Sequence, residues 1–118
     1  MPTKNRLADI YLRFLQLRET LRALPSLPPL DPLEERILSY LAKASLEHAQ
    51  ISVRGMMAHN EFGSPATVHS RLKSMRRKGW ITLADTDDAR RKQIELTQAA
   101  MLYFDQLSEC IVRAAEDR

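Results

Sequence analysis

The sequence predicts a mainly α-helical protein with one small β-hairpin. Apolar residues recur at spacings of three and four in several segments, which is the periodicity of helices packed on a core. Prolines and capping residues stand where these segments begin and end, and only residues 80–97 contain short β-prone stretches, on either side of a charged tip. With 118 residues, 44% hydrophobic and 28% charged, the chain has the size and composition of one folded domain.

The first predicted helix covers residues 4–24. Its apolar residues lie on one stripe, made of Leu7, Ile10, Tyr11, Phe14, Leu17, Leu21 and Leu24. Three prolines follow it between residues 25 and 29, and because proline lacks the backbone donor of a helix, an extended connector is expected there. Residues 1–30 are therefore predicted to form an N-terminal helix and a proline linker.

Two further helices are expected at the start of a central region, residues 31–97. Asp31, followed by Pro32, is a favourable helix start, because aspartate caps the first turn and proline fits into it. A shorter helix is expected over residues 52–59, with Ser52 as its cap.

The next helix of this region is predicted over residues 64–78. Ser64 and Pro65 again combine a cap with a first-turn proline, and Gly79 can adopt the left-handed conformation that ends a helix. Two short β-prone stretches joined by a charged tip, residues 84–92, then make the hairpin.

The strands of the hairpin are expected over residues 80–83 and 93–97, and a last helix over residues 98–115. The last helix is expected to bury Ala100, Phe104, Leu107 and Ile111. The order helix, helix, short helix, helix, hairpin, helix is that of a winged helix-turn-helix. Residues 31–97 are therefore predicted to form a winged helix-turn-helix domain, and residues 98–118 a C-terminal helix.

Positive charge is concentrated in one block of the chain. Residues 64–92 carry eight basic and three acidic side chains, although the net charge of the whole chain is only +3. Such a block on a nearly neutral protein indicates a defined surface for a polyanion.

The predicted helix over residues 64–78 has two distinct faces. Val68, Leu72 and Met75 share a narrow arc and are expected to face the core. The opposite face has short polar residues near the helix start and cations toward its end, which suits a DNA major groove. The candidate DNA contacts on this helix are Ser64, Pro65, Ala66, Thr67, His69, Ser70, Lys73 and Arg77. The same pattern also fits an ordinary solvated helix face, and His69 also fits a merely exposed histidine.

The hairpin tip is a second cationic element, directly after this helix. An arginine on a protruding ribbon can enter the narrow minor groove of DNA, and Arg90 has that place, with Asp88 able to orient it. Arg91 and Lys92 add to the charge of the tip. A solvated loop is the alternative, but two adjacent basic elements favour DNA binding.

The residues of this part of the chain resemble a known family. The segment from Thr67 to Ile81, followed by Asp88-x-Arg90 and Leu96-Thr97, is similar to the signature of the MarR (multiple antibiotic resistance regulator) transcription factors, and the resemblance covers roughly residues 33–100. It implies a winged helix with the helix from Ser64 in the major groove and Arg90 in the minor groove. It also implies a dimer formed by the terminal helices, and usually a repressor.

The sequence departs from this family at two places. Ala100 stands where the family usually has glycine, so the last helix is expected to begin without that break. The family often adds a second long C-terminal helix beyond the point where this sequence ends, and often has a pocket for a small-molecule effector. Whether this chain has an effector is left open.

Two apolar stripes predict a homodimer. They consist of Leu7, Ile10, Tyr11, Phe14, Leu17 and Leu21 on the first helix and of Phe104, Leu107 and Ile111 on the last. A DNA-binding core of this size is not expected to cover both stripes, although the two helices packing on each other within one chain is the alternative. Two-fold symmetry would set the recognition helices about one DNA turn apart and predicts a pseudo-palindromic site.

Other classes of function are not expected. The three histidines, His48, His59 and His69, fall in different predicted elements, and Cys110 is expected to be a small core residue. We therefore expect no catalytic residue, no metal site and no cofactor. No apolar run approaches the roughly 20 residues of a membrane span, so a cytoplasmic protein is expected.

The function predicted from the sequence is thus a sequence-specific regulator of transcription that binds double-stranded DNA, acting as a bacterial-type repressor. The helix over residues 64–78 would contact the major groove and the wing over residues 84–92 the minor groove. Two alternatives remain open: a plasmid partition or replication factor that binds DNA in a similar way, and a winged-helix adaptor that binds an acidic protein partner.

Overall fold

The computed structural model describes residues 6–23, 27–85 and 91–116. These residues form two compact units. The helical unit contains α1 (Leu7–Ala23) and the part of α5 (Gln98–Glu116) that begins at Met101. The winged-helix unit spans Leu27–Ala100 and contains all the other elements.

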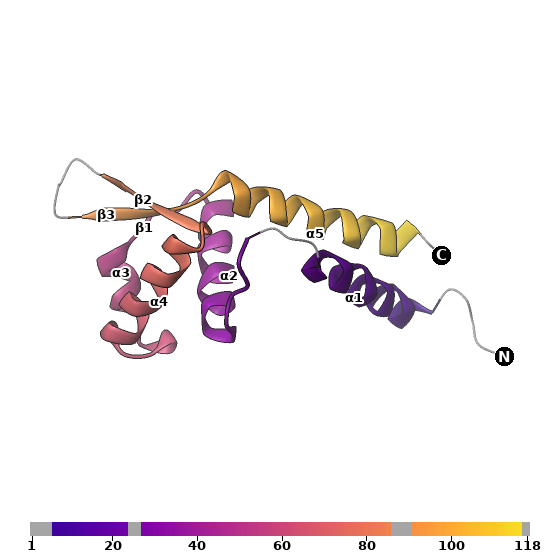
Figure 1. The fold of residues 1–118 in the computed structure, drawn as a ribbon, viewed down its shortest axis with the longest axis horizontal. Helices are drawn as coiled ribbons and strands as arrows, with labels where there is room; N and C mark the ends of the chain where they lie inside the picture. The colour runs from indigo at the N-terminus through magenta and orange to yellow at the C-terminus, as the bar shows by residue number, and fades with distance from the viewer. Residues whose placement is uncertain (1–5, 24–26, 86–90, 117–118) are drawn as a thin grey trace. The chain divides into compact units, whose positions relative to one another are not determined.

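The winged-helix unit contains helices and a small antiparallel sheet (Figure 1). Its elements are α2 (Pro32–Leu46), β1 (Ile51–Ser52), α3 (Val53–Met57), the 3-10 turn η1 (Asn60–Phe62), α4 (Pro65–Arg77), β2 (Ile81–Asp85) and β3 (Lys92–Leu96). The strand order is β1-β3-β2. The expected mainly α fold with a small hairpin, a winged helix-turn-helix, is confirmed.

The core of this unit is formed by residues from every helix and from the hairpin. The buried apolar side chains are Ile37, Leu38, Leu41, Met56, Phe62, Val68, Leu72, Met75, Trp80, Ile81, Ile94 and Ala100. Val68, Leu72 and Met75 lie on one face of α4, as the helical periodicity predicts. The opposite face of α4 is therefore left toward solvent.

Helix α2 has well-defined ends. The Asp31 carboxylate accepts a hydrogen bond from the Glu34 amide at 2.7 Å, and the Glu34 carboxylate accepts one from the Asp31 amide at 2.9 Å, so the two residues form a capping box. At the other end His48 has a φ of 58°, and the Ala49 amide bonds to the Ala44 carbonyl at 2.8 Å. The helix thus ends at a left-handed residue.

The sheet differs from expectation in two respects. Strand β1 was not anticipated, because two residues are too few to show a β periodicity; it pairs with β3 through Ile51 and Ile94. Trp80 was expected to begin a strand, but β2 begins one residue later. The Trp80 amide bonds to the Met75 carbonyl at 3.0 Å, so this residue belongs to the turn that ends α4.

The helical unit is formed by α1 and α5. Cys110 and Ala114 are buried here, so the expected burial of the cysteine is confirmed. The Arg13 Nε donates to the Ala114 carbonyl at 3.0 Å. Ile111 is 55% exposed in the single chain, on a face of α5 that no described residue covers.

Candidate nucleic-acid interface

Helix α4 begins with the cap that the sequence predicts. The Ser64 hydroxyl accepts a hydrogen bond from the Thr67 amide at 3.2 Å and donates to the Thr67 hydroxyl at 3.0 Å. Gly63 precedes this cap with a φ of 110°, a conformation that favours glycine. The chain therefore turns sharply from η1 into α4, and the start of α4 is fixed by local bonds.

The candidate contacts on α4 all lie at or near its solvent side. Ser64, Pro65, Ala66, His69, Ser70, Lys73 and Arg77 are exposed, and Thr67 is half-buried beside Ser64. The small residues stand in the first turns and the cations in the last ones. This face therefore has the distribution of size and charge that close approach to a groove and contact with flanking phosphates require.

Two cations of α4 are held by carboxylates at the start of α2. Arg71 Nε lies 2.9 Å from an Asp31 carboxylate oxygen, and Lys78 Nζ lies 2.8 Å from Glu34 Oε1. Because these are the two residues of the capping box, the same pair of carboxylates starts α2 and fixes α4.

The environment of Glu34 is unusual for a carboxylate, because its side chain is only 1% exposed. Burial raises the pKa of Glu34, but hydrogen bonds from Lys78 and from the Asp31 amide, with the positive charge of Lys78, lower it more. The net result is a pKa below the ordinary value of 4.5. Glu34 is therefore ionised at neutral pH and pairs with Lys78 as a charge.

The remaining cations of α4 are open. Lys73, Arg76 and Arg77 are exposed, and none of them pairs with a carboxylate in the part of the chain that the structure describes. Arg76 was not among the candidates from the sequence. Arg76 follows His69 by seven residues and Lys73 by three, and residues at these spacings are neighbours on a helix. This spacing could have identified Arg76 as a candidate contact from the sequence.

Arg76 also lines a depression at the junction of α3, α4 and β2. The depression has a volume of about 230 Å³ and is lined by Val53, His69, Leu72, Lys73, Arg76 and Leu83. Its lining combines aliphatic side chains with two cations and a histidine. Such a surface can hold the sugar and phosphate of one nucleotide, because the aliphatic side chains fit the sugar and the cations the phosphate.

The wing is described only at its base. Asp85 and Lys92 are partners in the register of β2 and β3, and the Lys92 amine donates to the Asp85 carboxylate. This hydrogen bond and the lysine charge lower the pKa of the exposed Asp85 carboxylate. Arg91 is exposed. Asp88 and Arg90, the other two candidates on the wing, lie outside the described residues.

The histidines do not gather into a site. His48 ends α2, His69 lies on α4, and His59 Nε2 lies 2.9 Å from the Tyr40 hydroxyl. Within residues 6–23, 27–85 and 91–116, no three His, Cys, Asp or Glu side chains are placed to hold a metal ion. No helix among those same residues is both long and apolar enough to cross a membrane.

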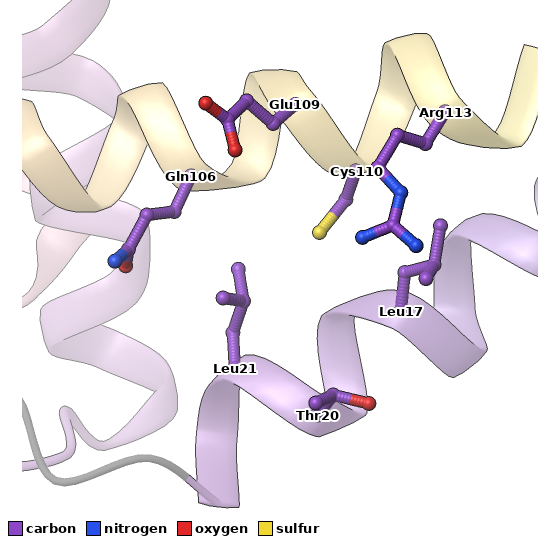
Figure 2. A pocket seen from close by; sticks show the side chains of 7 residues that line it. All are labelled: Leu17, Thr20, Leu21, Gln106, Glu109, Cys110 and Arg113. Carbon is purple, nitrogen blue, oxygen red and sulfur yellow. The ribbon is translucent and has the colours of Figure 1, made fainter.

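The helical unit has a cavity of its own. It has a volume of about 240 Å³ and is lined by Leu17, Thr20, Leu21, Gln106, Glu109, Cys110 and Arg113. Figure 2 shows Cys110 and Arg113 on α5 pointing toward the leucines of α1. The cavity is separate from the cationic surface of α4, which belongs to the winged-helix unit.

A winged helix-turn-helix with an open cationic recognition helix defines a class of DNA-binding proteins. The family of the LexA DNA binding domain matches residues 29–90, which is more than half of the chain. The chain belongs to this family. No curated protein sequence matches it.

Solved structures share the fold over nearly the whole chain. The transcriptional regulator Tm0710 from Thermotoga maritima is 16% identical with a TM-score of 0.63, over 90% of this chain and 69% of that one. A mutant of MepR from a multidrug resistant S. aureus clinical isolate is 16% identical with a TM-score of 0.57, over 92% and 72%. The heme sensor protein PefR from Streptococcus agalactiae, in complex with heme, is 20% identical with a TM-score of 0.52, over 91% and 76%.

These neighbours share the fold of the chain, so the predicted MarR-like fold is confirmed. The family places the chain among winged-helix proteins that bind DNA. This is a class of protein that is not enzymatic, in agreement with the expectation from the sequence.

Proposed function

We propose that the protein is a sequence-specific repressor that binds double-stranded DNA as a homodimer, with α4 in the major groove and the wing in the minor groove. One observation carries the proposal: Lys73, Arg76 and Arg77 are exposed on α4, outside the face that α4 buries and without a carboxylate partner among the described residues. A folded domain gains nothing in stability from leaving three neighbouring cations unpaired. A polyanionic partner explains them.

Sequence preference would come from the first turns of α4. Ala66 allows the helix backbone to approach the base edges, and Ser70 and His69 can form hydrogen bonds with them. The cations at the other end of α4 would contact phosphates, and the depression beside Arg76 would hold one sugar and its phosphate. Arg90, which lies outside the described residues, would add a contact in the minor groove.

The proposed dimer rests on apolar residues of the helical unit that their own chain leaves exposed. Leu7 is 73% exposed and Tyr11 61%, and both are among the residues expected to form the interface, as is Ile111. Exposed apolar surface of this kind is typical of an interface. The other expected interface residues, Ile10, Phe14, Leu17, Leu21, Phe104 and Leu107, are half-buried in the single chain, so each has surface left to contribute.

A mobility-shift titration with mixed genomic fragments tests this function. We expect retardation at low salt, selection of fragments with a two-fold related sequence, and an affinity that falls steeply with salt, with a log–log slope of about −0.9 for each phosphate contacted. No retardation at low salt would contradict the proposal and would indicate a protein partner instead. A shift without any selected sequence would contradict the specific repressor.

A further inference from the structure

The turn that directly follows α4 is unusually well connected. It consists of Lys78, which ends the helix, Gly79, which has a φ of 88°, and Trp80, which is 4% exposed. The Gly79 amide bonds to the Arg76 carbonyl at 3.1 Å and the Trp80 amide to the Met75 carbonyl at 3.0 Å, so the turn is continuous with the last turn of α4. A displacement of this turn therefore moves the end of α4 that carries the open cations.

The chain segment that enters the winged-helix unit is bound to this turn by hydrogen bonds and packing. The Trp80 indole Nε1 donates to the Pro28 carbonyl at 2.8 Å. Leu27 packs against Gly79 so closely that a Cβ at that glycine would lie 3.3 Å from the Leu27 Cδ2 atom. A few residues later Glu34 holds Lys78 at 2.8 Å. The segment from Leu27 to Glu34, at the start of the winged-helix unit, thus contacts each of the three residues of the turn.

The chain segment that leaves the winged-helix unit is hydrogen-bonded to the same turn. The Thr97 hydroxyl donates to the Gly79 carbonyl at 2.6 Å, and the Thr97 amide bonds to the Trp80 carbonyl at 3.2 Å. The same hydroxyl accepts from the Ala100 amide at 3.1 Å, within the first turn of α5. Since α5 continues into the helical unit, this connection reaches the turn through one residue, Thr97, by its hydroxyl and its backbone amide.

From this arrangement we infer that Trp80 and Thr97 are positioning residues, through which the state of the helical unit sets how α4 is presented to DNA. The inference rests on the proposed function. The chain crosses between the units only before Leu27 and after Ala100, and the nearby residues Pro28 and Thr97 both bind the turn that ends α4. A change in the helical unit that displaces either of these segments is therefore expected to displace the turn and, with it, the end of α4.

Substitution of Thr97 tests the second connection with a conservative control. Thr97→Val keeps the size of the side chain but removes the donor to Gly79 and the acceptor for Ala100, whereas Thr97→Ser keeps the hydroxyl. We expect Thr97→Val to weaken DNA binding by about tenfold, the effect of losing one or two hydrogen bonds, and Thr97→Ser to stay within about twofold. Equal affinities for the two variants would overturn the role of Thr97.

A double-mutant cycle separates positioning from stability. Cys110→Ala enlarges the cavity of the helical unit at a residue that is not part of the proposed dimer interface, and Cys110→Ser is a smaller change at the same place should the first variant not fold. We expect either change to alter the DNA affinity of the wild-type chain several-fold, and to alter it by less than about twofold when Trp80→Phe and Thr97→Val are both present. Independent, multiplicative effects would overturn the inference.

Trp80 is the only tryptophan of the chain, so its fluorescence reports on the turn itself. The emission of the otherwise wild-type chain should shift when Cys110 is changed, and this shift should be absent in the Thr97→Val background. An unchanged emission on cavity substitution would refute the coupling. If the wild-type chain binds no duplex at low salt, it is the proposed function that fails, and the fluorescence measurement still decides whether the two units are coupled.

Discussion

Asp31 and Glu34 each have two partners, one on their own helix and one on α4. Asp31 caps α2 and pairs with Arg71, while Glu34 completes the capping box and pairs with Lys78. Local bonds and distant ion pairs therefore depend on the same two carboxylates. Loss of either carboxylate weakens the start of α2 and the attachment of α4 together.

Glu34→Gln should lower the free energy of unfolding by about 1–3 kcal/mol, because it leaves Lys78 without its charged partner in a mostly buried position. The folded pKa of Glu34 lies below its ordinary value of 4.5, so its contribution is present above that pH and is lost as the pH falls through the folded pKa. Urea unfolding at pH 7 and at pH 3 measures both effects. The variant and the wild type should differ less at pH 3, and a constant difference would contradict this assignment.

Lys73→Ala and Arg76→Ala should each weaken DNA binding to all sequences. Each removes one proposed phosphate contact per protomer, so the salt slope should fall by about 0.9 for each protomer bound. Fluorescence anisotropy at several salt concentrations measures the slope. Lys43→Ala is the matched control, since Lys43 is an exposed lysine on α2 outside the proposed surface, and its slope should equal that of the wild type.

Among the elements, the wing is the one whose contribution to binding is easiest to isolate. Its base is closed by the pair of Asp85 and Lys92, so its tip can be changed without loss of the strands. Arg90→Ala should weaken binding to specific and unrelated duplexes alike, through the lost contact in the minor groove. Competition with a ligand that occupies the minor groove provides a second measurement. Unchanged affinity at moderate salt would show that the wing does not contact DNA.

The helices were predicted well because their ends are encoded locally. Ser64 with Pro65 starts α4, Gly79 ends it, and Ser52 caps α3, each within a few residues of the bond that it makes. The last helix begins without a break, as Ala100 predicts: it is fully buried and its amide bonds to Thr97. Hydrophobic periodicity and capping residues were therefore sufficient to predict where these helices begin and end.

The partners of the α4 cations could not be predicted in this way. Five cations lie from Arg71 to Lys78, and nothing in their local sequence distinguishes the two that are paired from the three that have no carboxylate partner among the described residues. The distinction depends on carboxylates about forty residues earlier, which only the packing of α2 on α4 brings near. The role of Trp80 was missed for the same reason, since its partner is the carbonyl of Pro28.

For the molecule as a whole, the state of association should determine DNA affinity. Tyr11→Glu places a charge on the exposed apolar surface of α1 and should shift the protein from dimer to monomer. Binding to a two-fold site should then fall by about a hundredfold or more, because the second half-site is no longer bound at high effective concentration. Sedimentation velocity and mobility shift measure the two effects.

Gln16→Glu is the control for this charge, because Gln16 is an exposed polar residue of the same helix. It should change neither association nor affinity. A monomeric wild-type chain that still binds its site tightly would contradict the dimer.

The dual partners of Asp31 and Glu34 also have a consequence for how the chain folds. Glu34 and Lys78 are 44 positions apart, so their contact forms only after a long loop has closed. The attachment of the first turn of α2 to the end of α4 is therefore completed late, at the same step as the docking of α4. Folding of the winged-helix unit should follow a single cooperative step, and a peptide of residues 31–46 alone should show a frayed start despite its capping box.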